Sequence, residues 1–326
     1  MNAPVHGGPD ARGAARWDFS TCANAAGPCP LALAAVRAAD CMRYPDPSYH
    51  ALRRRLAALH GVEPERVLLA ASASEFIQRI VAVGAHLAPG PVALPQPGYG
   101  DYARAARAFG RAIVPEHDGC ATLRFCADPG SPHGCGSDPP DNAAACPTVL
   151  DAVYAPLRLA GASRWDRAAR DAVFVLHSPN KALGLCGVRG AYAVAPARAA
   201  YDVARWVDAL RAAEPSWVLS AHGAAMLAAW CEPAVQGWVR DSLPRLARWK
   251  DALAAALRRR GAQVHDSETN FFCLRLRRAP APQALRAHAV AVRELSSFGL
   301  PGAWRLSVQP PRAQRALLAA LAEAGC

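Results

Sequence analysis

The sequence predicts an α/β fold with a mainly parallel central sheet, followed by a smaller α+β domain at its C-terminal end. Up to about residue 196, short runs rich in valine, leucine and alanine alternate with longer helical runs, which is typical of a parallel sheet with crossover helices. Beyond that point, long helical segments precede two further strands. A length of 326 residues is sufficient for two domains.

The first half of the chain alternates strands and helices. After a Gly/Pro/Ala-rich arm at 1–30, we expect a helix at 31–40 and a second within 44–61, ended by Gly61. The small residues after a buried strand at 66–70 mark the entry to a helix at 75–87. The other elements expected here are a strand at 91–95, a helix at 101–109 and strands at 148–154 and 172–178.

The second half is mainly helical. Its expected elements are helices at 197–213, 217–230, 233–260 and 311–323 and strands at 270–276 and 303–309. We divide the chain into an N-terminal arm that joins the small domain (1–43), a large domain (44–205) and a small C-terminal domain (206–326). The stretch 116–147 is the least regular, and we expect it to be partly loop.

The charge does not indicate a nucleic-acid partner. The formal net charge is +11, but the arginines are scattered over helical stretches and form no basic run interleaved with aromatic residues. A small phosphorylated or carboxylated substrate is compatible with this charge. The sequence also contains no apolar run long enough to span a bilayer and no signal-like start, so we expect a cytoplasmic protein without a membrane partner.

The eleven cysteines do not form a recognisable metal site. No CxxC pair occurs, and no set of cysteines and histidines has zinc-ligand spacing. We therefore expect reduced thiols and no metal, as is usual for a cytosolic protein.

One lysine stands out. Among 37 Lys+Arg residues, only Lys181 and Lys250 are lysine, and Lys181 lies in the apolar stretch HSPNKALGLCGVRGAY. Unlike arginine, lysine can lose its proton and attack a carbonyl, and apolar surroundings favour the neutral amine. The alternative is an ordinary surface lysine in a loop. Lys250 is expected to be a simple charge on the face of an amphipathic helix.

Residues elsewhere in the chain supply partners for this amine. Asp151 lies within the strand run TVLDAVY, where the carboxyl edge of a parallel sheet commonly meets ligands, although it could instead cap a helix. The small-residue turn before the 75–87 helix could hold an anion, or Ser72 and Glu75 could form a plain capping box. Arg305 interrupts an apolar strand, which indicates a bound anion or a structural ion pair.

In this order (anion loop, aromatic, Asp, Lys, Arg), the sequence resembles the fold-type I pyridoxal-phosphate enzymes of the class I/II aminotransferase superfamily. The resemblance extends from about residue 6 to 309. It is carried by DFSTCANAAGP, YPDPSYHALRRRLA, GVEPERVLLA, LDAVY, SPNKALGLCGVRGAY and DSETNFFCLRL, and is greatest to histidinol-phosphate aminotransferases and L-threonine-O-3-phosphate decarboxylases. It implies a three-layer fold whose large domain binds pyridoxal 5′-phosphate.

The resemblance also implies roles for individual residues. Lys181 matches the lysine that bonds to the cofactor and later transfers protons. Asp151 matches the carboxylate that keeps the pyridine nitrogen protonated, so that the ring can accept electrons. Tyr154 matches the donor to the phenolic oxygen of the ring, and Tyr99 the aromatic residue that stacks on it.

Further matches concern phosphate, partner and substrate. The remaining cofactor-binding matches are Ala73, Ser74, Ser131, Ser178, Asn180 and Arg189. Tyr44 matches a tyrosine that reaches the phosphate in the partner subunit, which implies a homodimer. Arg305 matches the arginine that binds the substrate carboxylate, while Asn24 and His6 would lie near the substrate.

Three features depart from the family pattern. DPGSPHG (128–134) replaces the usual Asn-Asn-Pro-Thr-Gly turn and places Ser131 where an asparagine normally contacts the ring oxygen. Asn180 replaces the usual serine before the lysine. The segment between Tyr99 and Asp151 is also short, which raises the possibility of a missing strand or helix.

The sequence leaves the reaction open. HGG at 6–8 and STCAN at 20–24 favour a decarboxylase of L-threonine O-3-phosphate that serves cobalamin synthesis, which we rank first. DSETNFF favours an aminotransferase acting on histidinol phosphate or another amino acid. A non-catalytic protein of the same fold is the third possibility.

Overall fold

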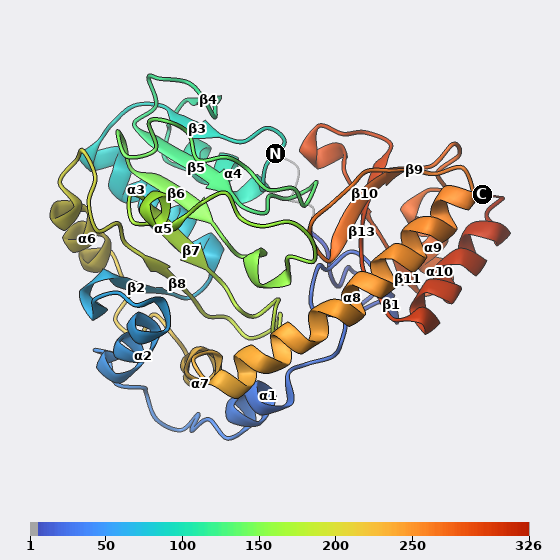
Figure 1. The fold of residues 1–326 in the computed structure, drawn as a ribbon, viewed down its shortest axis with the longest axis horizontal. Coiled ribbons are helices and arrows are strands. Elements are labelled where there is room, and N and C mark those ends of the chain that lie inside the picture. The colour runs from blue at the N-terminus through green and yellow to red at the C-terminus, as the bar shows by residue number, and fades with distance from the viewer. Residues whose placement is uncertain (1–5, 326) are drawn as a thin grey trace.

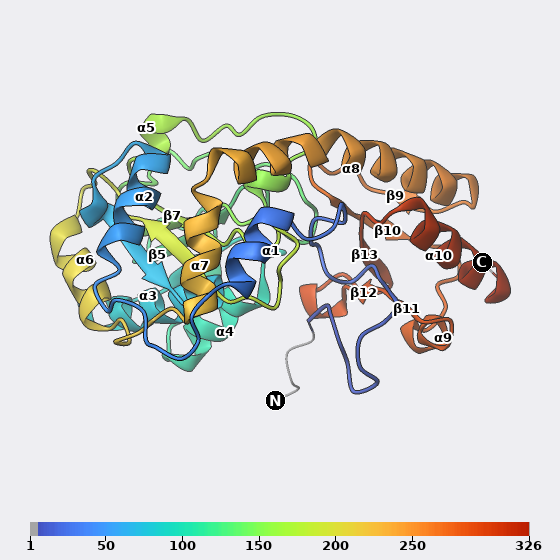
Figure 2. The same cartoon turned by 90° about the horizontal axis from the view of Figure 1, so that it is seen from below.

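A computed structural model describes residues 6–325. The chain forms a seven-stranded and a four-stranded sheet. Figure 1 shows the larger part, which contains the first sheet, beside the smaller part, which contains the second. The long helix α8 (Pro233–Arg259) runs across both parts, and Figure 2 shows this arrangement from below. Among the described residues, no helix is long and apolar enough to cross a membrane.

The larger sheet is mainly parallel, as predicted. Its strand order is β2-β8-β7-β6-β5-β3-β4, and the five strands from β7 to β4 are mutually parallel, whereas β8 runs against β2 and β7. The strands are β2 (Val67–Ala70), β3 (Val92–Leu94), β4 (Ile113–Pro115), β5 (Leu123–Ala127), β6 (Thr148–Asp151), β7 (Phe174–His177) and β8 (Ala191–Val194).

Helices cover both faces of this sheet, which confirms the predicted three-layer fold. In β2, Val67 and Leu69 pack into one core with α1 (Pro30–Arg37), α2 (His50–His60) and α7 (Ala221–Trp230). Leu68 and Ala70 pack into the opposite core with α3 (Ala73–Leu87), α4 (Gly100–Ala108) and α6 (Val203–Ala212). Side chains of a strand alternate between faces, and burial on both sides explains the nearly continuous apolar runs.

The smaller part has the expected α+β character. Its antiparallel sheet has the order β12-β13-β10-β9 and packs with α10 (Pro311–Glu323). Its remaining elements are β9 (Gln263–Val264), β10 (Phe271–Arg275), β11 (Val290–Ala291), β12 (Arg293–Glu294), β13 (Ala303–Ser307) and α9 (Pro282–Ala287). The N-terminal arm contributes β1 (Trp17–Asp18), which pairs with β11, and Phe19, which enters this core.

Helix α8 belongs to two cores. Val235 and Leu246 pack with the larger part, whereas Leu253 and Leu257 pack with the smaller part. Trp206, at the predicted boundary, also packs in a core of the larger part. The division at residue 206 remains a prediction, and these contacts favour a later boundary within α8.

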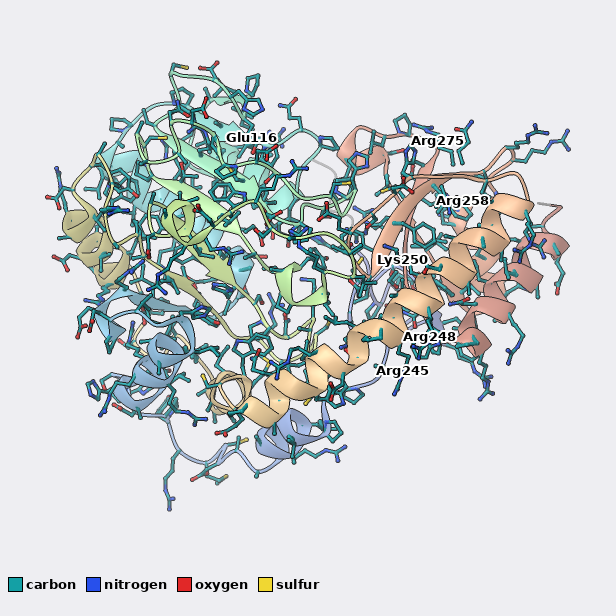
Figure 3. All side chains as sticks on the ribbon, in the orientation of Figure 1. Glu116, Arg245, Arg248, Lys250, Arg258 and Arg275 are labelled. Atoms are coloured by element: carbon teal, nitrogen blue, oxygen red, sulfur yellow. The ribbon has the colours of Figure 1, made fainter. Side chains whose placement is uncertain are left out.

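Lys250 on α8 is not the simple surface charge that the sequence suggested. Figure 3 labels it beside Arg245, Arg248 and Arg258. Its Nζ donates to the carbonyl oxygens of Ser267 and, at 3.3 Å, of Thr269. Burial lowers the pKa of this amine. Lys250 therefore ties α8 to the segment that precedes β10.

Two strands, β4 and β5, lie between Tyr99 and Asp151, and the connections around them are short. Strands β4 and β5, like β8, were not predicted as separate elements. Residues 116–122 between β4 and β5, and 128–147 between β5 and β6, contain no α-helix. The helices of a usual crossover are absent, and a loop-side core that includes Cys126, Leu150 and Trp165 covers the sheet at this point.

Arg124 on β5 secures these short connections. It is buried with 1% exposure, and its guanidinium donates to the carbonyl oxygens of Glu116 at 2.9 Å and Asp118 at 3.3 Å, with a longer contact to that of Asn142 at 3.5 Å. These carbonyls belong to both helix-free loops. The buried cation therefore satisfies backbone acceptors that the short connections leave without a helix.

Replacing Arg124 by methionine should destabilise the protein without altering the cavity chemistry. The substitution keeps a long side chain but leaves buried carbonyls unsatisfied, which should lower the free energy of unfolding by about 2–4 kcal/mol. Urea denaturation measures the change. Arg275, whose guanidinium donates to the exposed carbonyl of Pro301, gives the control Arg275→Met. Equal stability of the two variants would contradict the role of Arg124.

Two partly buried histidines lie between β7 and α2. The rings of His60 and His177 are 4.6 Å apart, and His60 Nε2 lies 2.8 Å from the hydroxyl of Tyr192. Burial lowers the pKa of His60 to about 4, and it also lowers that of His177 well below the ordinary value. The positive charge of Arg170 adds to both shifts. Both imidazoles are therefore neutral in the folded protein near neutral pH.

This pair predicts a loss of stability in mild acid. The unfolded chain takes up protons below pH about 6.5, but folded His60 does so only near pH 4, so the free energy of unfolding decreases as the pH falls through this window. We expect His60 to account for about 2 kcal/mol between pH 7 and 4.5. Urea titrations at several pH values should show a shallower dependence for His60→Gln; parallel curves for variant and wild type would refute this account.

Candidate active site

A cavity of about 1600 Å³ lies where the two parts of the molecule meet. Its walls come from the carboxyl ends of the parallel strands, the first turns of α3 and α4, and the small-part strand β13. The cavity is lined by Asp151, Tyr154, Lys181 and Arg305, among others. Ligands of open α/β sheets commonly bind at this edge.

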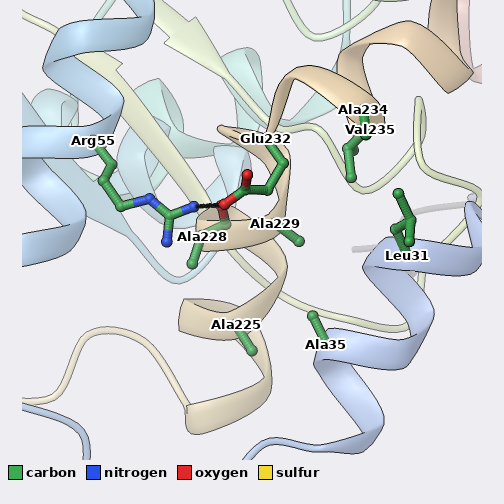
Figure 4. Close-up of a pocket in the computed structure, with 9 residues that line it drawn as sticks. All are labelled: Leu31, Ala35, Arg55, Ala225, Ala228, Ala229, Glu232, Ala234 and Val235. Atoms are coloured by element: carbon green, nitrogen blue, oxygen red, sulfur yellow. Dashed lines mark hydrogen bonds and ion pairs between the residues drawn. The ribbon is translucent and has the colours of Figure 1, made fainter.

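A second hollow of about 500 Å³ lies between α1, α7 and the start of α8 (Figure 4). Alanine, leucine and valine side chains line most of it. Its charged residues, Arg55 and Glu232, pair with each other at 2.5 Å. This hollow offers no nucleophile, so the larger cavity is the candidate site.

Lys181 is held by a fixed backbone turn after β7. The carbonyl of Lys181 accepts from the amide N–H of Asn24 at 2.9 Å, and that of Leu183 accepts from Cys29 at 2.8 Å. Gly184 has φ +67°, and a Cβ there would lie 2.7 Å from the carbonyl oxygen of Gly27. The N-terminal arm and the lysine turn therefore fit together only with glycine at position 184.

The surroundings of Lys181 favour the neutral amine. Burial lowers its pKa, and Arg305 adds to this shift, whereas Cys186, Asp151 and Cys22 oppose it. The amine lies 5.3 Å from the centre of the Tyr154 ring. A lysine whose pKa is lowered in this way is suited to attack a carbonyl and to transfer protons.

Asp151 ends β6 with its carboxylate buried. Its Oδ2 accepts from the hydroxyl of Tyr102 at 2.6 Å, and its Oδ1 accepts from the amide of Val153 at 3.0 Å. Burial raises the pKa of Asp151, while these two donors and Lys181 counteract that effect. Asp151 is therefore not a helix cap, which was the alternative interpretation of its position.

Two tyrosines line the same region. Tyr154 packs edge-on against Phe271, with ring centres 4.8 Å apart, and burial raises its pKa, so its hydroxyl stays protonated as a donor. The hydroxyl of Tyr99 lies 3.1 Å from Ser74 Oγ and donates to Asp101 Oδ2 at 2.9 Å. The Tyr99 ring thus stands beside the first turn of α3.

The first turn of α3 contains both the helix cap and the candidate anion site that the sequence suggested as alternatives. Ser72 caps the helix, because its Oγ accepts from the amide of Glu75 at 3.1 Å. Ala73 and Ser74 nevertheless line the cavity. The first amide groups of a helix have no acceptor within it, and the helix dipole favours an anion there.

Ser178, Asn180 and Arg189 also line the cavity. Ser178 Oγ donates to Asn180 Oδ1 at 3.0 Å, and Asn180 Nδ2 donates to the carbonyl of Cys186 at 3.4 Å. Asn180, which departs from the family pattern, thus connects both ends of the lysine turn. Arg189 is exposed at the cavity wall.

Arg305 extends into the cavity from β13. Its guanidinium donates to Ser131 Oγ at 2.7 Å and lies 5.4 Å from the centre of the Phe271 ring. Its Nε is buried without a hydrogen-bond partner. A buried donor without a partner fits an anionic ligand such as a carboxylate. Ser131, predicted to contact the cofactor ring, lies beside this arginine.

The altered turn at 128–134 is firmly anchored. Asp128 is 1% exposed and forms a 2.7 Å ion pair with Arg158, which also pairs with Glu268. Gly134 has φ +76°, and a Cβ there would lie 2.3 Å from Ser267 Oγ. The turn therefore packs closely on the segment before β10.

Of the other three predicted site residues, one lines the cavity and two do not. His6 lines the cavity, with its ring centre 6.4 Å from that of Tyr99. Asn24 does not line it, because its side chain donates to the carbonyl of Ala182 at 3.0 Å and to Ser242 Oγ at 2.8 Å. Tyr44 lies on the surface, 77% exposed and stacked on Trp217 at 4.4 Å.

The sequence alone did not reveal several residues of the cavity. Asp101 and Tyr102 lie in the first turn of α4, which begins directly after Tyr99. Their spacing in the sequence does not indicate that Asp101 accepts from Tyr99 or that Tyr102 donates to Asp151. Cys22 was grouped with the inert thiols, yet it lines the cavity, and its pKa is raised by burial and lowered in part by Arg305 and Lys181. Arg293 also lines the cavity.

These residues fit pyridoxal phosphate. A partly buried amine, a buried carboxylate, a helix N-terminus and protonated tyrosines surround one cavity. They would serve as the covalent anchor, the partner of the ring nitrogen, the phosphate cradle and the ring contacts. In addition, the unpartnered Nε of Arg305 could donate a hydrogen bond to an anionic group of the substrate.

Known proteins with similar sequences include several aminotransferases. The model of the family "Aminotransferase class I and II" matches residues 19–120 and 142–323, and the unmatched residues between them comprise β5 and parts of the two helix-free loops that flank it. A histidinol-phosphate aminotransferase of Jannaschia sp. (strain CCS1) is 27% identical, covering 91% of this chain and 88% of that protein. One from Anaeromyxobacter sp. (strain Fw109-5) is 30% identical over the same shares.

Solved structures share the fold. A histidinol-phosphate aminotransferase from Sinorhizobium meliloti, in complex with pyridoxal 5′-phosphate, has a TM-score of 0.75 at 20% identity and covers 93% of this chain and 89% of its own. L-Threonine-O-3-phosphate decarboxylase from Porphyromonas gingivalis has a TM-score of 0.76 at 21% identity and covers 94% and 98%. The chain therefore belongs to the class I and II aminotransferase family and is a fold-type I enzyme whose cofactor is pyridoxal 5′-phosphate.

Proposed function

We propose that this enzyme is an aminotransferase that acts on a small phosphorylated amine or amino acid, with histidinol phosphate as the first candidate. The observation that carries the proposal is that Lys181, an amine whose pKa is lowered, lines one cavity with Asp151 and Arg305. The curated relatives named above are histidinol-phosphate aminotransferases. They favour this reaction over the decarboxylation that the sequence ranked first, and the family assignment favours an enzyme over a non-catalytic protein.

The side chains would divide the chemistry among them. When bound, pyridoxal phosphate supplies a ring that accepts the electron pair left by a broken bond at the substrate Cα. Lys181 anchors the cofactor and moves the proton at Cα. Asp151 would keep the ring nitrogen protonated, Tyr154 would donate to the phenolic oxygen, and Tyr99 would stack on the ring.

Anionic groups would be bound at separate places. The amides of Ala73 and Ser74, with Ser178, Asn180 and Arg189, would hold the cofactor phosphate. Arg305, supported by Ser131, would bind a substrate carboxylate where one is present. His6 and Asn24 are proposed to lie near the substrate phosphate, although Asn24 would have to exchange its present hydrogen bonds.

We also propose a homodimer in the cytoplasm. Tyr44 is exposed on the surface, where its ring stacks on Trp217, and it does not line the cavity of its own subunit. In a homodimer it would reach the phosphate of the partner subunit.

Decarboxylation of L-threonine O-3-phosphate is the second candidate. The observation that favours it is that His6 and Gly7 line the cavity. They belong to the HGG segment, which resembles the start of such decarboxylases. Gly8 donates its amide to Ser20 Oγ at 2.8 Å, which holds the segment in place. The two reactions differ in which bond at Cα lies perpendicular to the ring.

A substrate comparison separates the candidates. Purified enzyme with pyridoxal phosphate should convert histidinol phosphate in the presence of 2-oxoglutarate and form glutamate, which a coupled assay detects. L-Threonine O-3-phosphate should release little CO2. CO2 release with formation of aminopropanol phosphate, and no oxo-acid-dependent turnover, would reverse this ranking.

The two lysines provide a matched test of the cofactor anchor. Wild type and Lys250→Ala should both become yellow with pyridoxal phosphate and lose the colour with borohydride, because Lys181 remains. Lys181→Ala should not develop the absorbance of the covalent adduct when pyridoxal phosphate is added. Absorption spectra measure the difference, and unfolding curves should show destabilisation of Lys250→Ala alone, by about 1–3 kcal/mol. An adduct spectrum in Lys181→Ala would contradict the assignment.

A further inference from the structure

Tyr102 connects two walls of the candidate site. Its side chain is 1% exposed, and its ring stacks on Phe125 with centres 4.7 Å apart. The edge of the ring meets Tyr99 at 5.6 Å, and its hydroxyl donates to Asp151 Oδ2 at 2.6 Å. One residue of α4 thus touches both the proposed stacking ring and the proposed partner of the ring nitrogen.

The direction of this hydrogen bond is defined by chemistry. Burial and the neighbouring Asp151 raise the pKa of Tyr102 well above its ordinary value, so the hydroxyl keeps its proton. A protonated hydroxyl donates to the carboxylate oxygen. The other oxygen of Asp151 accepts from the amide of Val153. Both donors stabilise the negative form of a carboxyl group that burial would otherwise neutralise.

A purely structural role does not require the hydroxyl. Packing against Phe125 and Tyr99 needs only an aromatic ring, and phenylalanine would supply it. The hydroxyl is buried, and the bond that it forms is to Asp151. This distinction separates ring packing from an effect on the carboxylate.

We propose that Tyr102 is a positioning residue. It keeps Asp151 ionised and oriented to accept a hydrogen bond from the protonated ring nitrogen of pyridoxal phosphate. The inference rests on the role proposed above for Asp151. Without the donor, the shared proton moves toward the carboxylate, and the ring loses part of its capacity to accept electrons. Tyr102 acts through Asp151 and needs no contact with the substrate.

The test is Tyr102→Phe, read by ¹⁵N NMR of enzyme loaded with ring-¹⁵N pyridoxal phosphate. The resonance should shift toward that of an unprotonated pyridine. In the substrate assay, kcat should fall about tenfold or more with little change in KM, because a hydrogen bond to a charged group is lost. Thermal unfolding and the dissociation constant for the cofactor show whether the variant remains folded and loaded.

Tyr192→Phe is the matched control. Tyr192 is also fully buried, and its hydroxyl bonds to Trp230 at 3.1 Å in the core behind the sheet. This control should lose stability but keep the wild-type ¹⁵N resonance. If Tyr102→Phe does not fold, 3-fluorotyrosine at position 102, a stronger donor of nearly the same shape, should shift the resonance in the opposite direction.

The outcomes distinguish this inference from the function on which it rests. An unchanged ¹⁵N resonance in Tyr102→Phe or in the fluorotyrosine variant, with wild type loaded normally, would overturn the inference alone. A wild-type protein that binds no pyridoxal phosphate would overturn the proposed function and the inference together.

Discussion

Parallel pairing of β5, β6 and β7 is the constraint on which the site depends. The register places Ala127, Asp151 and Leu176 side by side, so these strands reach their carboxyl ends at one edge of the sheet. The residues that follow them, including Ser131 and Lys181, must then enter the same cavity. The smaller part closes the cavity by presenting Arg305 on a strand of its own sheet. Site geometry is thus a consequence of strand register and of the packing of two cores along α8.

Local patterns predicted most of this framework. The apolar runs of β2, β6 and β7 and the final helix were found from the sequence, because burial on both faces of a sheet leaves a clear signal. Strand β5 was missed because Arg124 interrupts its apolar pattern, and that arginine is needed to hold loops distant in the chain. The order of residues indicated Lys181, Asp151 and Arg305, whereas the contact of Tyr102 with Asp151 depends on strand pairing that spacing does not encode.

The retention of two lysines in an arginine-rich chain has two physical explanations. Lys181 occupies a buried turn where burial lowers its pKa, and its amine performs chemistry that a guanidinium cannot. Lys250 places a compact amine between two carbonyl oxygens. The larger, planar guanidinium of arginine has a different donor geometry. The altered turn at 128–134 likewise keeps its place through other contacts, since Asp128 and Arg158 form a buried ion pair there.

Peptide mapping of borohydride-reduced enzyme is the most direct measurement of the central claim, that Lys181 is the covalent anchor of the cofactor. Reduction converts the labile bond to the cofactor into a stable one, and mass spectrometry then locates the modified residue. The account predicts a single pyridoxyl-modified peptide containing Lys181. Modification at Lys250 or at the N-terminal amine, with Lys181 unmodified, would contradict it.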